Sequence, residues 1–176
     1  MKPYIKWVLL VVILSVAVHF AAVWAFPFAI MGLVTQKFMD QTGAVPNQVF
    51  HSPLPTPDHR VVVMPSPDLL YSMIVYDLAE GPLKIEADVP PDTYWSLAFY
   101  SWNTDNYHHV NDLEARGRLD YLLSTKEQNV VEPVNTMGVI SPSRKGVILA
   151  RILVNDPVRT AQWEMYQRKL TCRVFR

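Results

Sequence analysis

The first part of the chain is dominated by one long apolar run. Residues 7–36 contain no Asp, Glu, Lys or Arg, and most of them are apolar. A helix needs about 20 apolar residues to cross a bilayer, so the pattern predicts a transmembrane span from about Trp7 to Phe26. Pro27 lacks a backbone donor and is expected to kink or end this straight section. Residues 28–34 would then continue as an interfacial turn or short helix.

The charges that flank this run predict how it crosses the bilayer. Lys2 and Lys6 precede it, whereas Lys37 is soon followed by Asp40. Because positive charge marks the cytoplasmic side, we expect the N-terminus in the cytoplasm and the remainder of the chain outside it. A cleaved signal peptide is the alternative, but this apolar run is too long for a typical signal. An uncleaved anchor over residues 1–36 is therefore favoured.

Three side chains of the anchor are candidate contacts of the bilayer or of a partner helix. Trp7 and Trp24 lie near the two ends of the predicted span, where amphipathic rings favour the membrane interface. His19 lies inside the span, and an ionisable residue at that depth indicates a function. It can hydrogen-bond a neighbouring helix. Heme or metal ligation is the other reading, for which a partner helix would have to supply the second ligand.

The pattern changes twice after the anchor. Residues 37–58 hold four prolines and are expected to form a stalk, of which residues 51–58 are extended and polyproline-like, or a segment that lies across the domain surface as an edge. From residue 59 onward, short runs of β-branched and aromatic residues are cut by Pro, Gly and Asp, as is typical of strands. Leu83, Ile85 and Ala87 alternate with charged residues, which indicates one buried and one solvated face.

Short turns between these runs favour antiparallel pairing. We therefore predict a mainly β domain over residues 59–176, an antiparallel β-sandwich or jelly-roll with one C-terminal helix, preceded by a single transmembrane helix. Residues 103–123 break the strand pattern and are expected to form a polar loop region. The predicted strands cover residues 59–64, 69–78, 82–89, 93–102, 129–134, 136–141, 146–154 and 170–175.

The C-terminal helix has a recognisable start. Asp156 is a suitable cap and Pro157 suits the first helical position. The side chains expected to face the sheet are Val158, Ala161 and Met165, with Trp163 as a further candidate.

Charge is balanced overall but unevenly distributed. The chain has 16 basic and 16 acidic residues, so its net charge gives no indication of a nucleic-acid partner. Residues 38–143 hold five basic and fourteen acidic residues, whereas 144–176 hold eight basic and two acidic residues. We expect the basic end to pair with the acidic middle; an anionic lipid surface or an acidic partner is the alternative. With Cys172 as the single cysteine, the sequence allows no disulfide within the chain and no Cys-based metal site.

Aromatic residues supply the first candidate ligand site, since binding pockets are commonly lined by aromatic side chains with few polar groups. The more ordinary role of such residues is to fill a core. The candidates are Tyr71, Tyr94, Trp95, Tyr100 and Trp102.

The second candidate site is the polar segment around Asp105, His108 and His109. Imidazole and carboxylate groups together suit a divalent metal, yet adjacent His residues on an extended segment point to opposite faces. We therefore predict no metal and no cofactor, and interpret the segment as a solvated or partner-binding loop. Arg151 lies within an apolar strand and is expected to pair with an acid, Asp77 or Asp105. No Gly-x-Ser-x-Gly sequence is present.

Two stretches carry a family resemblance. PSPDLLYS, followed by DLAEGPLKIEADVPPDTYWSLAFYSWNTDNY, resembles the domain-of-unknown-function family 1254. The anchor's WAFP and the late GVILARILVNDP are similar to short, membrane-anchored bacterial members. The resemblance implies a β-rich extracytoplasmic domain in a Gram-negative bacterium. The family has no established reaction, so it transfers no catalytic residues.

These observations favour a single-pass inner-membrane protein whose periplasmic β-domain is a non-enzymatic binding or accessory subunit of an envelope complex. Its expected partners are the lipid bilayer and a membrane or periplasmic protein. The alternative function is a membrane-tethered enzyme or carrier for a small or lipid-like ligand, acting through the aromatic residues and the His108–His109 loop.

Overall fold

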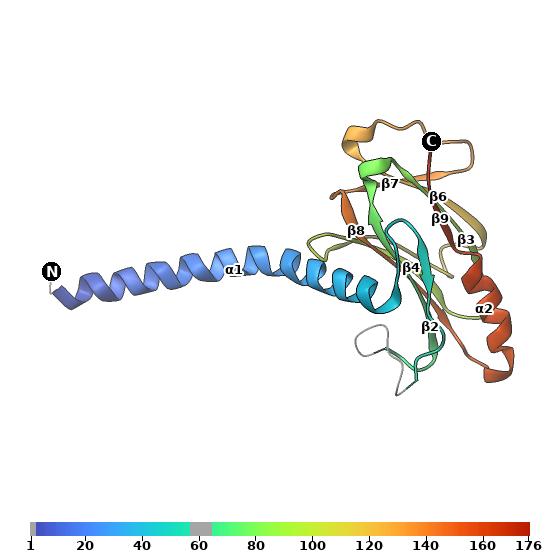
Figure 1. Cartoon of the computed structure of the whole chain (residues 1–176), viewed down its shortest axis with the longest axis horizontal. Helices are drawn as coiled ribbons and strands as arrows, with labels where there is room; N and C mark the ends of the chain where they lie inside the picture. Colours follow the sequence, from blue (N-terminus) through green and yellow to red (C-terminus); the bar gives the residue numbers. More distant parts are fainter. Residues whose placement is uncertain (1–2, 57–64) are drawn as a thin grey trace.

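A long N-terminal helix leads into a two-layered β-domain in the computed structural model, which describes residues 3–56 and 65–176 (Figure 1). The strand predicted over residues 59–64 lies outside the described residues. The domain is mainly β, as predicted, with two sheets and one C-terminal helix.

Helix α1 (Pro3–Thr42) runs without a break past Pro27. The expectation that Pro27 ends the straight section is therefore wrong, and residues 37–42 at the start of the predicted stalk belong to the helix. A proline removes one hydrogen bond of the helix ladder, and packing of the following turns against the domain compensates for that loss. Figure 1 shows a helix that bends gently and continues into the domain.

The chain after α1 runs along the edge of the domain. Strand β1 (Val49–His51) pairs antiparallel with β2 (Leu69–Asp77), and Val49 lies opposite Ile74. The edge alternative for the proline-rich segment is therefore confirmed at these residues. An edge is the usual place for a chain rich in prolines, because their missing N–H groups need not pair with a neighbour.

The first sheet has five strands in the order β1-β2-β8-β4-β5, all antiparallel. Besides β1 and β2 it contains β4 (Trp95–Ser101), β5 (Asn106–Asn111) and β8 (Lys145–Leu153).

The second sheet has four strands in the order β7-β6-β3-β9. It contains β3 (Leu83–Val89), β6 (Gly117–Thr125), β7 (Met137–Ser141) and β9 (Thr171–Val174). Strand β7 runs parallel to β6, so the sandwich is mixed rather than purely antiparallel. Parallel strands need a longer connection than a hairpin, and the one between β6 and β7 includes a short 3-10 helix, Lys126–Gln128.

The segment 103–123 is not the polar loop region that its composition predicts, because it contains β5 and most of β6. The register of β5 shifts between Phe99 and Tyr100 of β4, so Tyr107 is an extra residue in a β-bulge. A bulge disturbs the alternation of side chains, which explains why the strand pattern is hidden in the sequence. The strand predicted over residues 129–134 is absent from the described fold, which has a loop there.

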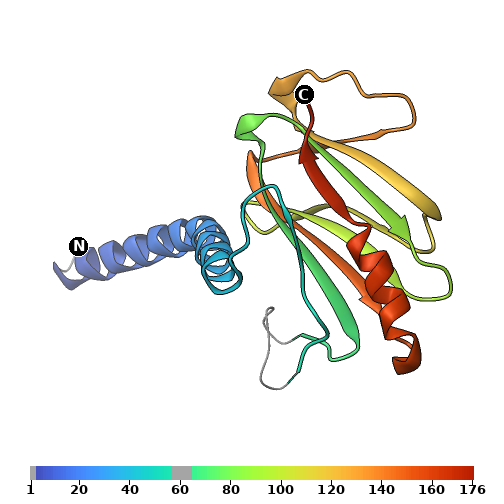
Figure 2. The ribbon, with the colours of Figure 1, turned by 45° about the vertical axis from the view of Figure 1, so that its right-hand side comes forward.

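The core lies between the two sheets and is built by the inward side chains of each strand (Figure 2). Its largest fully buried members are Trp163, Tyr76, Tyr121, Phe99, Leu70, Ile74, Leu78, Leu83, Ile85, Leu97 and Leu123.

Helix α2 (Thr160–Arg168) follows a 3-10 turn, Pro157–Arg159, whose backbone is capped by the Asp156 carboxylate as predicted. The predicted inward face is wrong except for Trp163, which is fully buried. Val158, Ala161 and Met165 are exposed. Val158 lies in the turn before the helix, and Ala161 and Met165 lie on the side of the helix opposite to Trp163 and Gln167. The buried face carries Trp163, Gln167 and, after the helix, Leu170.

The last four turns of α1 pack on the outer face of the five-stranded sheet. Met31 and Phe38 lie against Val75 and Val147, and the Phe38 ring meets Phe50 edge to face with centroids 5.4 Å apart. This second, smaller core joins the helix to the domain. The outer face of the five-stranded sheet is therefore the side of the domain from which α1 projects (Figures 1 and 2).

Candidate functional site

The five aromatic candidates lie in three different environments. Trp95 points into the sandwich core. Tyr71 is on the opposite face of the same sheet, where its hydroxyl accepts a hydrogen bond from the Ser66 backbone N–H. Tyr94 is exposed beside the start of β4. Because these side chains point in different directions, the described residues do not form a pocket lined by all of them.

Tyr100 and Trp102 pack with the α1 junction. The Trp102 ring lies beside Gly32 of α1, where an added Cβ would sit 3.8 Å from the ring. Lys145 Nζ lies 5.9 Å from the centroid of the same ring. The Trp102 backbone N–H is fixed by Ser143 Oγ at 2.9 Å. These contacts make Trp102 part of the surface on which α1 packs.

The segment around the two histidines does not gather its polar groups at one point. His109 is exposed, whereas the ring of His108 lies between Phe99 and Tyr121, at centroid distances of 5.2 and 5.5 Å. The Asp105 carboxylate instead accepts a hydrogen bond from the Asn103 amide. Within residues 3–56 and 65–176 there is no group of three or more His, Cys, Asp or Glu side chains arranged to hold a metal ion.

His108 is a polar group placed against the core. Its Nε2 is buried and has no hydrogen-bond partner among the described residues. Burial lowers the pKa of His108, and the neighbouring His109 acts in the same direction, against the opposing effect of Glu114. Since charge is disfavoured in this setting, the folded domain holds His108 as the neutral imidazole.

A chain of buried hydroxyls connects the two sheets near the end of β2. Tyr76 Oη lies 2.8 Å from Ser141 Oγ and 3.2 Å from Tyr107 Oη, and donates to the Tyr100 carbonyl at 3.2 Å in one arrangement of its proton. Burial raises the pKa of Tyr107. Ser141 donates onward to the Ser143 carbonyl at 2.6 Å. These bonds satisfy polar groups inside the core, and we assign them a structural role.

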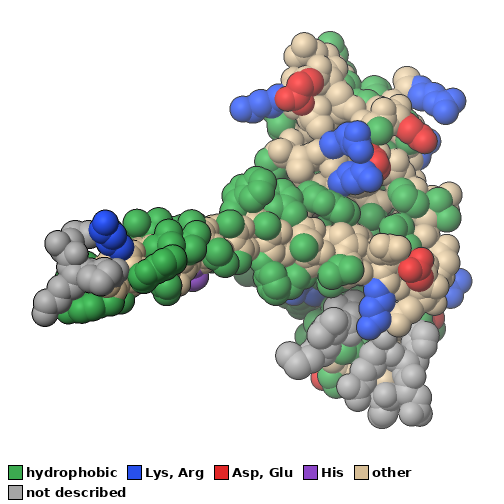
Figure 3. Space-filling model, turned by 60° about the vertical axis from the view of Figure 1, so that its left-hand side comes forward, with side chains coloured by type: hydrophobic (Ala, Val, Ile, Leu, Met, Phe, Trp, Pro, Cys, Tyr) green, Lys and Arg blue, Asp and Glu red, His purple; other side chains and the backbone are tan. Residues whose placement is uncertain are grey.

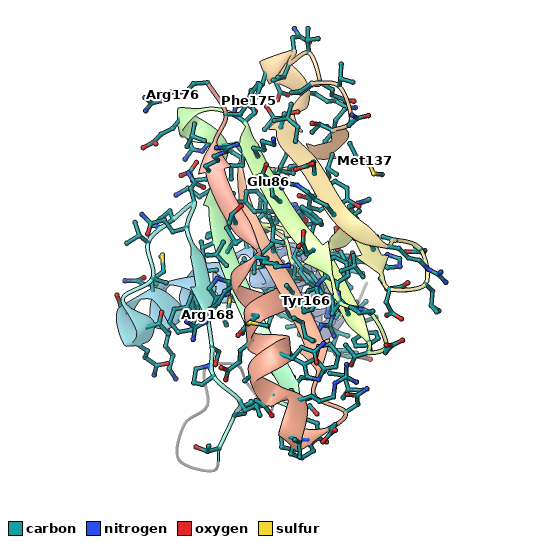
Figure 4. All side chains as sticks on the ribbon, turned by 90° about the vertical axis from the view of Figure 1, so that its right-hand side faces the viewer. Glu86, Met137, Tyr166, Arg168, Phe175 and Arg176 are labelled. Carbon is teal, nitrogen blue, oxygen red and sulfur yellow. The ribbon has the colours of Figure 1, made fainter. Side chains whose placement is uncertain are left out.

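Charged side chains cover the outer face of the four-stranded sheet. Glu86 lies at the centre of this face (Figure 4), 2.8 Å from Arg118 and 2.9 Å from Lys84. The Lys84 hydrogen bond, with help from nearby cations, lowers the pKa of Glu86 to about 2. Arg173 is a third cation within 3.8 Å, and Lys169 pairs with Asp88 at 2.8 Å.

These ion pairs show how far the basic C-terminal segment pairs with the acidic middle of the chain. Four of the eight basic residues of the C-terminal segment pair with acids of the middle segment, as expected: Arg144 and Lys145 with Asp77, Lys169 with Asp88 and Arg173 with Glu86. Figure 4 views the side of the domain opposite to α1 and shows Arg168 and Arg176 on it. Lys145 of the same segment lies instead beside Trp102 at the packed end of α1, so the basic residues are spread over both sides of the domain.

Two depressions in the surface of the domain are lined by none of the five aromatic candidates. One of about 740 Å³ is lined by residues that include Leu78, Thr125, Ile140 and Arg144. Another, of about 530 Å³, includes Cys172, whose pKa burial raises to about 12. The thiol is therefore protonated at neutral pH and unreactive.

Residues 46–174 match the family described as "Protein of unknown function (DUF1254)". The chain belongs to the DUF1254 family. The match covers the β-domain and leaves the whole of α1 outside it. No functionally curated protein matches the DUF1254 chain.

Two solved structures are similar to this DUF1254 chain. The VPA0106 protein of Vibrio parahaemolyticus matches 88% of the chain at 14% identity with a TM-score of 0.69, which establishes a shared fold. A putative uncharacterized protein from Burkholderia cenocepacia matches 77% at 18% identity with a TM-score of 0.49. The DUF1254 chain spans 37% of the length of each.

Arg151 of the DUF1254 domain departs most clearly from expectation. Asp77 is paired with Arg144 and Lys145 instead, at 3.3 and 3.4 Å, and Asp105 is bound to Asn103. Among the described residues Arg151 therefore has no acidic partner. In the sequence, a single arginine within an apolar strand marks Arg151 as a candidate functional residue. Ser96, its neighbour in the sheet, is a polar residue within the apolar strand β4 and could be singled out in the same way.

Proposed function

We propose that this DUF1254 protein is a single-pass inner-membrane protein whose periplasmic β-domain is a non-enzymatic binding or accessory subunit of an envelope complex. Helix α1 is long and apolar enough to span a membrane. Two lysines precede its uncharged section, which favours a cytoplasmic N-terminus.

The observation that carries the proposal is the division of α1 into a free part and a packed part. Every described side chain from Tyr4 to Phe26 is exposed, and apolar groups cover this surface (Figure 3). From Pro27 onward one face of the helix, including Met31 and Phe38, packs against the domain. An exposed apolar surface of this length needs a bilayer or protein partner around it.

The free part of α1 also has features that favour a partner helix. Small side chains recur at a spacing that brings them to one side of a helix, and such residues allow two helices to approach closely in a membrane. His19 lies next to this side and has no hydrogen-bond partner among the described residues, although its ring meets Phe20. The small residues are Ser15, Ala22 and Ala25.

The arrangement of α1 gives the domain two different sides. The five-stranded sheet faces the side from which α1 projects, and the four-stranded sheet with the Glu86 network faces away (Figures 1 and 4). With α1 in the bilayer, the charged face is the one available to periplasmic partners. A soluble partner would meet ion pairs there, and a membrane partner would meet α1.

Membrane topology is tested with the full chain fused at its C-terminus to alkaline phosphatase or to a fluorescent protein that folds only in the cytoplasm. The proposal expects phosphatase activity, no fluorescence and resistance of the chain to alkaline carbonate extraction. Fluorescence of the C-terminal fusion, or release of the intact chain by carbonate, would contradict the proposed topology.

The accessory role is tested by purification of the full chain in a mild detergent with mass spectrometry of co-purifying proteins. We expect a membrane protein in stoichiometric amount, lost in Ala22→Leu. The matched control is Ala17→Leu, the same change on another side of α1, which should retain the partner. Recovery of the chain alone from cross-linked membranes would overturn the accessory-subunit role and leave the topology result standing.

A further inference from the structure

One row of polar side chains crosses the face of the five-stranded sheet on which α1 packs. Arg151 of β8 lies directly opposite Tyr71 of β2 on one side and Ser96 of β4 on the other. Ser96 in turn lies opposite Asn111 of β5. Neighbouring strands are about 4.8 Å apart, so four side chains able to donate hydrogen bonds form a continuous row.

The row is distinct from the surroundings on this face. The next row contains Met73, Leu149 and Ala98, and the one after it contains Val75 and Val147, which α1 covers. A cation in the middle of an apolar sheet face is costly unless something pairs with it. No apolar packing requirement explains an arginine at this position.

Two groups in the row are buried and unsatisfied. Arg151 Nε and Ser96 Oγ are both inaccessible to solvent and have no hydrogen-bond partner among the described residues. The side-chain amide oxygen of Asn111, Oδ1, accepts hydrogen bonds from the backbone N–H groups of Leu113 and Glu114, which leaves its amide NH2 group as a donor. Buried polar groups in native proteins are usually hydrogen-bonded, so two unsatisfied groups in one row call for an explanation, and a bound partner that accepts hydrogen bonds is one.

We propose that Arg151, Ser96, Asn111 and Tyr71 form a binding site for the phosphate group of an amphiphilic or small organic phosphate. The guanidinium presents its donors as a planar fork that matches a phosphate bidentately. The Ser96 hydroxyl and the Asn111 amide add donors on the next two strands. The apolar row formed by Met73 and Leu149 would hold the hydrocarbon part of such a ligand.

The same chemistry has two sources, a phospholipid headgroup and a soluble phosphate ester. The site lies on the sheet face from which α1 projects, which makes a headgroup accessible to it in a membrane-anchored protein. The inference concerns the domain alone, and it does not depend on the topology of α1 or on a partner helix.

The test uses the full chain in a neutral detergent and in nanodiscs. Binding of sn-glycerol 3-phosphate is measured by calorimetry in detergent, and retention of phosphatidylglycerol over phosphatidylcholine is measured by mass spectrometry of co-purified lipid. We expect at least one probe to bind. Glycerol phosphate binding indicates a soluble source, and selective lipid retention without it indicates a headgroup. Binding of neither probe would overturn the proposal.

Matched variants decide whether the bound phosphate occupies this row. Arg151→Gln should weaken binding at least tenfold, since the interaction is charge-assisted. Arg118→Gln removes the same charge from the exposed face of the other sheet and should leave binding unchanged. Equal binding by wild type and Arg151→Gln, or equal loss in both variants, would place the phosphate elsewhere and overturn the assignment.

Two milder variants keep the test decisive if Arg151→Gln fails to fold. Arg151→Lys keeps the charge but loses the bidentate fork, and Ser96→Ala removes one donor with little change in volume. Both should weaken binding several-fold while the melting temperature stays within a few degrees of wild type. Unchanged affinity in both folded variants would contradict the site.

Discussion

Gly146 lies directly beneath the phenol ring of Tyr76, its cross-strand partner between β8 and β2. A Cβ atom at position 146 would collide with the Tyr76 hydroxyl and with the Tyr100 carbonyl. The absence of a side chain at this one position therefore lets Tyr76 reach across the core to Ser141 and Tyr107.

Gly146→Ala should destabilise the domain by about 1–3 kcal/mol, because the added methyl forces the ring or the strand to move in a well-packed core. Denaturant unfolding of the detergent-solubilised full chain measures the loss. Gly32→Ala is the control, since its Cβ would make only an ordinary contact with Trp102 and alanine favours a helix. Equal stability of Gly146→Ala and wild type would show that the close approach is not constraining.

Gln167 holds α2 to the first sheet. Its amide donates to the Ser52 and Tyr71 carbonyls, both at 2.9 Å, and the side chain is buried. Gln167→Met has a similar volume but removes both hydrogen bonds. The Tyr71 carbonyl keeps the Ser52 backbone N–H as a donor, so the substitution should cost about 1–3 kcal/mol. Faster hydrogen exchange in α2 and at the β1–β2 edge would report the loss.

The control for Gln167 also tests the observed face of α2. Met165 is exposed on the same helix, so Met165→Gln should leave both stability and exchange unchanged. Destabilisation by Met165→Gln would instead support the inward face that the sequence pattern predicts.

The neutral state of His108 predicts a dependence of stability on pH. The pKa of His108 is lowered in the folded domain by burial, so the unfolded chain binds the proton first as the pH falls. The contribution is therefore fully present above the unfolded pKa, near 6.5, and is lost as the pH decreases below it. His51, whose pKa is lowered by burial and by Arg168, acts in the same direction.

His108→Phe should reduce the loss of unfolding free energy between pH 7 and 5, because the side chain fits the setting between Phe99 and Tyr121 but cannot be protonated. His109→Phe changes an exposed neighbour and should keep the wild-type slope. The measurement is denaturant unfolding at several pH values. An unchanged slope in His108→Phe would assign the pH dependence to His51 or to another group.

Glu86 predicts a second, more acidic range. Its pKa is lowered to about 2, so its stabilising contribution is present above the unfolded pKa, near 4.3, and is lost as the pH falls toward 2. Glu86→Gln should cost about 1 kcal/mol at pH 7, since the network is at the surface, and should flatten the stability curve between pH 4 and 2. Added salt should shrink the difference at pH 7.

Much of the fold is predictable because its strands follow simple periodicities. Leu83, Ile85 and Ala87 alternate with exposed charges, and β3 was recognisable from them. The bulge at Tyr107 puts consecutive side chains toward the core, so β5 carries no such alternation and its polar residues resemble a loop. The length of α1 is equally hidden, because packing around Phe38 outweighs the local effect of Pro27.

The sequence identifies the residue types of the candidate sites, but not which of these side chains lie together in the fold. Aromatic residues near one another in the sequence were expected to line one pocket, yet alternation sends Trp95 into the core and Tyr100 to the other face. The row through Arg151 depends on the pairing of β2, β8, β4 and β5, which lie far apart in the sequence. Register between distant strands is a tertiary property, and no local pattern specifies it.

The unbroken passage of α1 into the domain has a mechanical consequence. A helix of 40 residues is about 60 Å long, and its last turns are wedged against the five-stranded sheet without an intervening linker. Transmembrane helices tilt when the bilayer becomes thinner. With no joint between helix and sandwich, the domain must swing through the same angle, so the thickness of the membrane would set the direction in which the charged sheet faces.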